Sequence, residues 1–382
     1  DRALFSAAAA ANAAFGLSTL DRARVVATCA GRALVDRASV PSWSDLSGYY
    51  ETADGGHLQF HCNFAHHAAG VVAELGCEPT RDAVQAAVLE RDADELEATL
   101  VERGMIAARL RTLEQWDEHP HALATADLPL ITVERIGDGA PRDPSRRRRV
   151  LDASRVLAGP VAGQTFAAHG ADVLRIGSAD LPSVEIGVLT TGSGKRNAFV
   201  ELGTAAGRAT MQHLLSGADV WIDAYRPGAF EGRGFGLDTI ARGSVTVQLC
   251  AFDWVGPWAG RRGFDSIVQS TTGIVLAGSR AAGTARPTPL PVQALDYSTG
   301  LLAAFAAERL VQHQAAVGGT WLARLSLLRT RNWLVNMGGP SPFEPSTTTT
   351  PFGEVTTAGP ISGSWSHGPQ PLGSSAPEWL AR

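Results

Sequence analysis

Three short loops and one aspartate in this chain have residue types that suit chemistry on a charged ligand. The loops combine glycine with proline or basic side chains: Gly159-Pro160 opens a predicted helix, 192–196 reads Gly-Ser-Gly-Lys-Arg, and 225–228 reads Tyr-Arg-Pro-Gly. Helix N-termini and nearby Arg or Lys side chains favour phosphate groups, so we expect a phosphorylated ligand. Asp296 lies between an extended stretch and a predicted helix, either as a reactive carboxylate or as an ordinary N-cap.

Common nucleotide, nucleophile and metal motifs fail the spacing that each requires. Lys195 follows Gly192 by three residues and Arg196 replaces the hydroxyl residue, which excludes a P-loop. The glycines of 232–236 do not open a helix after a first strand, so the dinucleotide fingerprint fails, and no Gly-x-Ser-x-Gly elbow occurs. A further group straddles a strand end and a helix start without an evident supporting carboxylate: His61, Cys62, His66 and His67. We predict packing or surface roles for these residues and no metal site.

The elements that must position these loops alternate between strands and helices after about residue 150. The strand-like segments are 150–152, 172–176, 198–202, 219–224 and 244–250. This alternation predicts an α/β fold with a Rossmann-like parallel sheet, covered by helices on both faces. In such a sheet the carboxyl ends of the strands line the ligand crevice, and the loops named above follow strands.

The chain before this region predicts a smaller α/β domain, which begins with a hairpin around an Asp-Gly turn between residues 49 and 60. Residues 137–149 combine turn formers with a basic run, which indicates either a solvated linker or an anion-attracting rim. The predicted parts are a helical segment 1–45, a small domain 46–136, a linker 137–149, a large domain 150–335 and an extended C-terminal tail 336–382.

Composition excludes several classes of protein. The 382 residues are 45% hydrophobic and 19% charged, which excludes a disordered or fibrous chain. The net charge of −5 makes nucleic acid an unexpected partner.

The four cysteines have no Cys-x-x-Cys spacing, which favours a reducing compartment. The Ala-rich opening is too short to span a bilayer and lacks a basic flank, so we expect a cytoplasmic location without membrane attachment.

The same segments resemble family III CoA-transferases, the L-carnitine dehydratase and bile-acid-inducible protein F family. The resemblance covers about 150–335, with motifs in the family's order and near its spacing. The matching motifs are 150–152 through Gly159-Pro160 to 170–176, then 194–196, 218–220 with 225–228, 256–258 through 263–265 to Gln269, and 291–296. Residues 371–373 and 379–380 also resemble the family's usual ending.

The resemblance implies roles for individual residues. The family's catalytic aspartate falls on Asp296, and its CoA-contacting basic positions match Arg226, Arg175, Lys195 and Arg196. Lys195 is the only lysine in the chain, which agrees with a retained ligand contact. Backbone N–H groups near Gly159 would stabilise oxyanions. CoA and acyl-CoA would be substrates, with a carboxylic acid as acceptor and no permanently bound cofactor. Because Asp296 must be ionised to attack a thioester, we expect that it is not strongly buried.

Departures from the family pattern leave alternatives open. Phe264 replaces the histidine that 2-methylacyl-CoA racemases use, and Leu157 replaces the glutamine of formyl-CoA transferases. The predicted small domain precedes the large one, which suggests either a fusion whose degenerate first large domain survives as the N-terminal segment or a circular permutation. A homodimer and an intrachain pseudo-dimer are both compatible with this order. An acyl-CoA racemase or isomerase and a non-catalytic CoA-binding subunit are the alternatives to CoA transfer.

Overall fold

The computed structural model describes residues 2–17, 19–36, 38–336, 346–350, 353–357 and 365–380. The chain forms two compact units. We call them the sheet unit, which comprises 1–40, 129–250 and 294–382, and the small unit, which comprises 41–128 and 251–293.

The expected continuous stretch 150–335 is therefore interrupted, because residues 251–293 group with the small unit. The reason lies in side-chain packing and hydrogen bonds that sequence periodicity does not reveal. Ser270 donates a hydrogen bond to Gln59 Oε1 at 2.6 Å, and Arg111 Nη1 donates to Thr271 Oγ1 at 2.7 Å. Partners more than 150 residues apart thus tie the inserted segment to the small unit.

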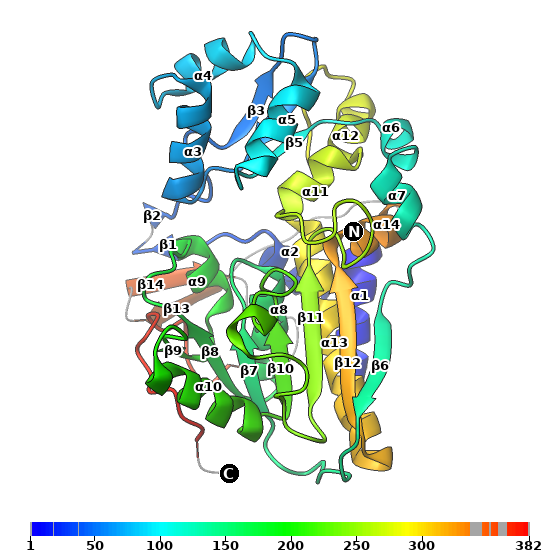
Figure 1. Ribbon diagram of the computed structural model, residues 1–382. Helices are drawn as coiled ribbons and strands as arrows, with labels where there is room; N and C mark the ends of the chain where they lie inside the picture. Colours follow the sequence, from blue (N-terminus) through cyan, green and yellow to red (C-terminus); the bar gives the residue numbers. More distant parts are fainter. Residues whose placement is uncertain are drawn as a thin grey trace. The chain divides into compact units, whose positions relative to one another are not determined.

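The sheet unit is built on seven strands in the spatial order β6-β12-β11-β10-β7-β8-β9, visible side by side in Figure 1. These strands are β6 (Thr132–Gly137), β7 (Arg149–Ala153), β8 (Asp172–Gly177), β9 (Arg196–Phe199), β10 (Val220–Asp223), β11 (Val245–Cys250) and β12 (Thr320–Ser326). Strands β7 to β12 pair in parallel, and β6 joins β12 antiparallel. In chain order the parallel strands read 3-2-1-4-5-6, which confirms the predicted Rossmann-like α/β fold.

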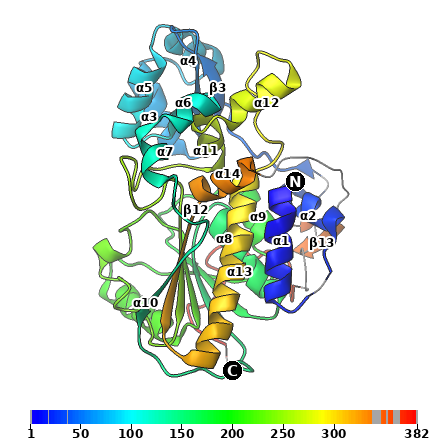
Figure 2. The same cartoon turned by 90° about the vertical axis from the view of Figure 1, so that its right-hand side faces the viewer.

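Helices cover both faces of this sheet (Figure 2). The helices of the sheet unit are α1 (Arg2–Ala14), α2 (Arg22–Cys29), α8 (Ala158–Ala168), α9 (Glu185–Thr191), α10 (Ala205–Gly217), the short 3₁₀ turn η1 (Glu231–Arg233), α13 (Ala294–Val317) and α14 (Leu327–Val335). Helices α8, α13 and α1 pack successively on one face, and α10 packs on the other. The core beneath α10 includes Leu151, Met211 and Trp221, all buried.

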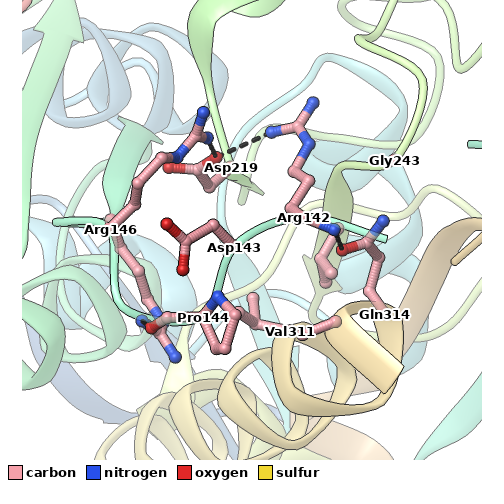
Figure 3. Close-up of a pocket in the computed structure, with 11 residues that line it drawn as sticks. Arg142, Asp143, Pro144, Arg146, Asp219, Gly243, Val311 and Gln314 are labelled. Carbon is pink, nitrogen blue, oxygen red and sulfur yellow. Dashed lines mark hydrogen bonds and ion pairs between the residues drawn. The ribbon is translucent and has the colours of Figure 1, made fainter. Parts of the chain in front are cut away.

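The basic run in 137–149 is mostly exposed, as expected of a solvated connection, but several of its arginines also form ion pairs within the sheet unit. Arg142 Nη1 and Arg146 Nη2 lie 2.7 and 2.9 Å from Asp219 Oδ1, as Figure 3 shows. Arg148 pairs with Glu308 at 2.9 Å. A pocket lined by these arginines lies at the amino ends of β10 and β11. Arg142 and Arg146 thus share the carboxylate of Asp219, and Arg148 pairs with that of Glu308, all within the same unit.

The described parts of the C-terminal tail also pack on the sheet unit. Strands β13 (Ser346–Thr350) and β14 (Gly353–Thr357) are antiparallel. Strand β14 pairs with β1 (Leu34–Val35), which pairs with β2 (Ala38–Ser39). Residues 365–380 run beside β9, where Ser375 N donates to Asn197 O at 2.7 Å. The expected extended tail thus supplies short strands and covers the outer edge of the main sheet.

The small unit contains the predicted hairpin. Its antiparallel strands are β3 (Gly48–Glu51), β4 (His57–Phe60) and β5 (Ala107–Arg109). Its helices are α3 (Ala65–Leu75), α4 (Arg81–Val88), α5 (Ala93–Glu102), α6 (Leu113–Asp117), α7 (Pro120–Thr125), α11 (Asp265–Thr271) and α12 (Ile274–Ala282). Leu58, Phe60, Val84 and Leu96 form its buried core. Among the described residues of the whole chain, no helix is long and apolar enough to cross a membrane.

Candidate functional site

The order of the parallel strands reverses between β7 and β10. These two strands are neighbours, but the chain leaves β7 toward β8 on one side and reaches β11 from β10 on the other. In open α/β sheets, ligands bind outside the carboxyl ends of the strands at this point of divergence. The connections that border it here are residues 154–157, which lead into α8, and residues 224–228. We call this side of the sheet the carboxyl edge.

Residues 154–157 adopt an unusual backbone that brings α8 close to the sheet. Val156 has a φ of 68°, a strained conformation for a β-branched residue. A Cβ added to Gly159 would lie 2.4 Å from Ser154 Cβ and 2.8 Å from Ala224 Cβ. Only glycine therefore allows the first turn of α8 to approach both strand ends. The prediction that backbone N–H groups near Gly159 stabilise oxyanions stays a prediction.

Asp296 lies in the first turn of α13, not at the N-cap position. Because α13 leads into the amino end of β12, the start of this helix is at the carboxyl edge. One turn later, a Cβ on Gly300 would lie 2.4 Å from Ala158 O, so the starts of α13 and α8 are in close contact. The side chain of Asp296 is buried, with the residue 7% exposed, which corrects the expectation of weak burial.

Arg226 is the predicted CoA contact that the structure leaves most available. It lies in the turn after β10, is exposed, and makes no side-chain hydrogen bond or ion pair with the described residues. Neither Asp223 nor Glu231, the nearest acidic residues in sequence, forms an ion pair with it. Its guanidinium is therefore free to bind an anion at the point where β7 and β10 diverge.

Arg175 lies on β8 at the same register position as Asp152 on β7. It has no side-chain hydrogen bond to a described residue, and burial lowers the pKa of its guanidinium. Burial also raises the pKa of the Tyr225 phenol, while the positive charges of Arg155 and Arg175 oppose that rise. Strand β7 separates β8 from β10, so Arg175 lies two strands from the turn that carries Arg226.

Lys195 has no access to a ligand in this structure. It is fully buried, with Nζ 2.7 Å from Asp152 Oδ2 and 2.6 Å from Pro160 O. A Cβ on Gly163 would lie 2.4 Å from Asp152 Oδ2, so the glycine makes room for this pair beneath α8. Burial lowers the pKa of Lys195, and the Asp152 carboxylate opposes the change. We do not retain Lys195 as a CoA contact, although its uniqueness in the sequence pointed to one.

Arg196 also uses its charge inside the fold. Its guanidinium binds Asp172 at 2.8 Å and donates to Glu378 O at 2.7 Å. We therefore do not retain Arg196 as a CoA contact either. Asp172 was the available signal for Arg196, because it lies on β8, next to the strand β9 that Arg196 begins, whereas Asp152 lies on β7, one strand farther.

Asp223 is a residue that the sequence analysis did not place in the site. It is the last residue of β10 and is buried directly before the turn of Arg226. Burial raises the pKa of its carboxyl to about 7, far above that of an exposed aspartate. Its position two residues before the Tyr-Arg-Pro-Gly sequence was the signal that could have identified it.

The histidines near residue 61 belong to an aromatic cluster in the small unit. The rings of His61 and Phe264 have centroids 4.1 Å apart. Burial, with the nearby His67, lowers the pKa of His61 to about 3, so its ring is neutral at physiological pH. Among the described residues, no group of three or more His, Cys, Asp or Glu side chains could hold a metal ion.

Comparisons with known proteins place this geometry in a family. The chain is 28% identical over 231 residues to the acetyl-coenzyme A transferase nodX of Hypoxylon pulicicidum, which covers 59% of this chain and 36% of that protein. It is 26% identical over 330 residues to an acyl-CoA transferase of Gibberella moniliformis, covering 76% and 57%. The chain thus spans only about a third to a little over half the length of these relatives.

A solved structure and a family model give further matches. The crystal structure of the hypothetical protein Rv3272 from Mycobacterium tuberculosis is 25% identical, with a TM-score of 0.43 and coverage of 52% of this chain and 57% of that one. The model of CoA-transferase family III matches residues 147–338, just over half of the chain and most of the sheet unit. By this match, the chain belongs to CoA-transferase family III.

Proposed function

We propose that this chain transfers CoA from an acyl-CoA donor to a carboxylic acid acceptor, with Asp296 as the covalent carrier. The observation that carries the proposal is the position of Asp296 in the first turn of α13, at the edge of the sheet where Arg226 is free. The names of the two relatives above, an acetyl-coenzyme A transferase and an acyl-CoA transferase, support the same reaction class.

The reaction would proceed through two kinds of covalent intermediate. The Asp296 carboxylate attacks the donor thioester carbonyl, the C–S bond breaks, and a mixed anhydride and CoA thiolate form. The thiolate then attacks the Asp296 carbonyl, which releases the donor acid and leaves an aspartyl-CoA thioester. The acceptor carboxylate attacks this thioester to give a second anhydride. Attack of the thiolate on the acceptor's acyl carbon finally releases the new acyl-CoA and restores the carboxylate.

Burial of Asp296 suits this chemistry in one respect and opposes it in another. A dry site protects an anhydride from hydrolysis, which would otherwise waste the thioester. Burial also disfavours the charged carboxylate, so compensation is needed. The first turn of the 24-residue helix α13 supplies it, because the positive end of a helix dipole stabilises a nearby anion.

CoA would be held by its phosphates at the carboxyl edge, where β7 and β10 diverge. Arg226 offers a free, exposed guanidinium, and Arg175 lies on the neighbouring part of the sheet without a side-chain hydrogen bond to a described residue. Arginine binds phosphate through paired N–H groups, which suits this role. The backbone near Gly159 would stabilise the tetrahedral oxyanions, as its tight packing holds the first turn of α8 in place.

Trapping of the intermediate tests the proposal. We expect that hydroxylamine, added during turnover with an acyl-CoA donor, converts Asp296 alone to a hydroxamate detectable by peptide mass spectrometry. Asp296→Asn should lower transfer at least a thousandfold, whereas Asp238→Asn, at an exposed carboxylate in the same unit, should leave it unchanged. A fully active Asp296→Asn variant, or modification at another residue, would exclude the assignment.

Assays on the same purified protein distinguish CoA transfer from its two alternatives, a racemase or isomerase and a non-catalytic CoA-binding subunit. Incorporation of solvent deuterium into an acyl-CoA without an acceptor acid would indicate a racemase or isomerase, which Phe264 disfavours because it replaces the family's proton-carrying histidine. CoA binding without thioester exchange across a panel of donors and acids would indicate a non-catalytic subunit. Exchange that requires both a donor and an acceptor supports CoA transfer.

A further inference from the structure

A line of four polar side chains crosses the sheet between β6 and β10. Its β10 end, Asp223, lies beside the turn of Arg226. Gln248 Nε2 lies 3.3 Å from Asp223 Oδ2, and Arg324 Nε lies 3.0 Å from Gln248 Oε1. Arg324 Nη1 is 3.8 Å from Glu134 Oε2. The strands β10, β11 and β12 hold the first three residues at matching register positions. We call these four residues the strand relay.

Arginine determines the direction of the hydrogen bonds in the strand relay. Because a guanidinium only donates, Gln248 Oε1 must accept from Arg324, and Gln248 must present its NH₂ group to Asp223. The second oxygen of Asp223, Oδ1, accepts from the backbone N–H of Tyr225 at 3.1 Å. Both carboxyl oxygens of Asp223 therefore face donors, which suits the ionised form.

Burial works against that ionised form. Asp223 and Gln248 are each 5% exposed, and the negative charge of Glu231 also disfavours a second anion there. Arg155, Arg175 and Asp152 are charged groups coupled to the neighbouring Tyr225, and Arg324 and Glu134 are the charged members of the relay beyond Gln248. As a result the pKa of Asp223 is about 7, and its charge changes within the range where the protein would work.

We propose that Asp223 is a positioning residue for CoA, because its ionised carboxylate fixes the backbone of Tyr225 and thereby orders the turn that presents Arg226. This inference rests on the proposed function, in which Arg226 binds a CoA phosphate. A hydrogen bond to an ionised acceptor is about twice as strong as one to a neutral acceptor. Loss of the charge therefore loosens the turn, and CoA affinity falls as Asp223 takes up its proton.

The test compares CoA affinity of the wild type and Asp223→Asn by calorimetry between pH 5.5 and 8.5. Asparagine keeps an oxygen that can accept from Tyr225 but has no charge. We expect a constant affinity ratio near pH 5.5, where both side chains are neutral, and a further loss of about five- to tenfold in the variant relative to the wild type by pH 8.5. The ratio of the two affinities cancels the ionisation of CoA itself. Asp238→Asn is the matched control and should match the wild type at every pH.

A second variant acts on the relay at a distance from the turn. Gln248→Leu removes one donor from Asp223 while filling the same space, so the ionised form of Asp223 is less favoured. In the Gln248→Leu background, we therefore expect the ratio of CoA affinities without and with Asp223→Asn to change at a higher pH than in the wild type. A purely structural role would lower affinity without moving that pH.

The outcomes separate the two proposals. If the wild type binds CoA but the ratio for Asp223→Asn is constant with pH, the positioning role is excluded and the proposed function stands. If the variant binds more tightly at high pH, simple repulsion between Asp223 and the phosphate dominates, and the positioning role is again excluded. Absence of CoA binding by the wild type at all pH values would exclude both.

Discussion

The Gly-Lys-Arg loop at 194–196 and the Tyr-Arg-Pro-Gly turn at 225–228 carry similar basic motifs, but only the charges of the first loop form ion pairs within the described part of the fold. Lys195 and Arg196 meet carboxylates of Asp152 and Asp172 on neighbouring strands. Arg226 meets no carboxylate among the described residues. The difference shows that a basic loop of an α/β sheet is available to a ligand only where the adjoining strands leave it without a counterion.

The largest expected effect concerns the buried side of this comparison. Lys195→Met should lower the free energy of unfolding by about 3–5 kcal/mol, because it leaves the Asp152 charge buried without its partner. Arg226→Ala should change it by less than about 0.5 kcal/mol. Urea unfolding at neutral pH measures both. A double variant, Lys195→Met with Asp152→Leu, should regain much of the loss, and equal effects of Lys195→Met and Arg226→Ala would contradict the comparison.

The pH dependence of stability sharpens the comparison at the turn after β10. Because burial raises the pKa of Asp223 to about 7, the folded protein binds this proton more tightly than the unfolded chain. The contribution of Asp223 to stability is therefore present below about pH 4 and is lost as pH rises to about 7, with a total on the order of 4 kcal/mol at most. Asp223→Asn should thus be more stable than the wild type at pH 8 and more nearly equal at pH 5, as measured by urea unfolding at both pH values. A constant difference would show that the charge of Asp223 is not suppressed by burial.

The smallest expected effect in free energy concerns CoA affinity at the free arginine. Arg226→Ala should weaken CoA binding by about 1.5–3 kcal/mol, or roughly ten- to a hundredfold, and should reduce its salt dependence. Arg226→Lys should lose almost as much, because lysine does not reproduce the paired N–H contacts. Arg208→Ala, at a residue of α10 bonded to backbone carbonyls, is the control. Unchanged affinity in calorimetry with a lower melting temperature would instead make Arg226 structural.

The predictions from sequence succeeded where the information is local. Alternating apolar runs and helical periodicities predicted the strands from Arg149 to Cys250, and the Asp-Gly turn predicted the hairpin of β3 and β4. Domain bounds were less accurate, since residues 251–293 join the small unit through hydrogen bonds to residues far away in the chain. The ion pairs of the basic run were not predicted, because nothing in its own sequence shows Asp219 and Glu308.

The sequence by itself determined the alternation of strands and helices, the resemblance of the motifs to one family, and the position of Asp296 at the start of a helix. Only the tertiary structure decided which charges are free and which carboxylates are buried. The physical reason is that a pKa, an ion pair or an exposed fraction depends on what surrounds a side chain in space. Asp223 and Gln248 are 25 positions apart and become neighbours because β10 and β11 pair, whereas Lys195 and Asp152, 43 positions apart, are joined by side-chain contact beneath α8 although β8 separates their strands.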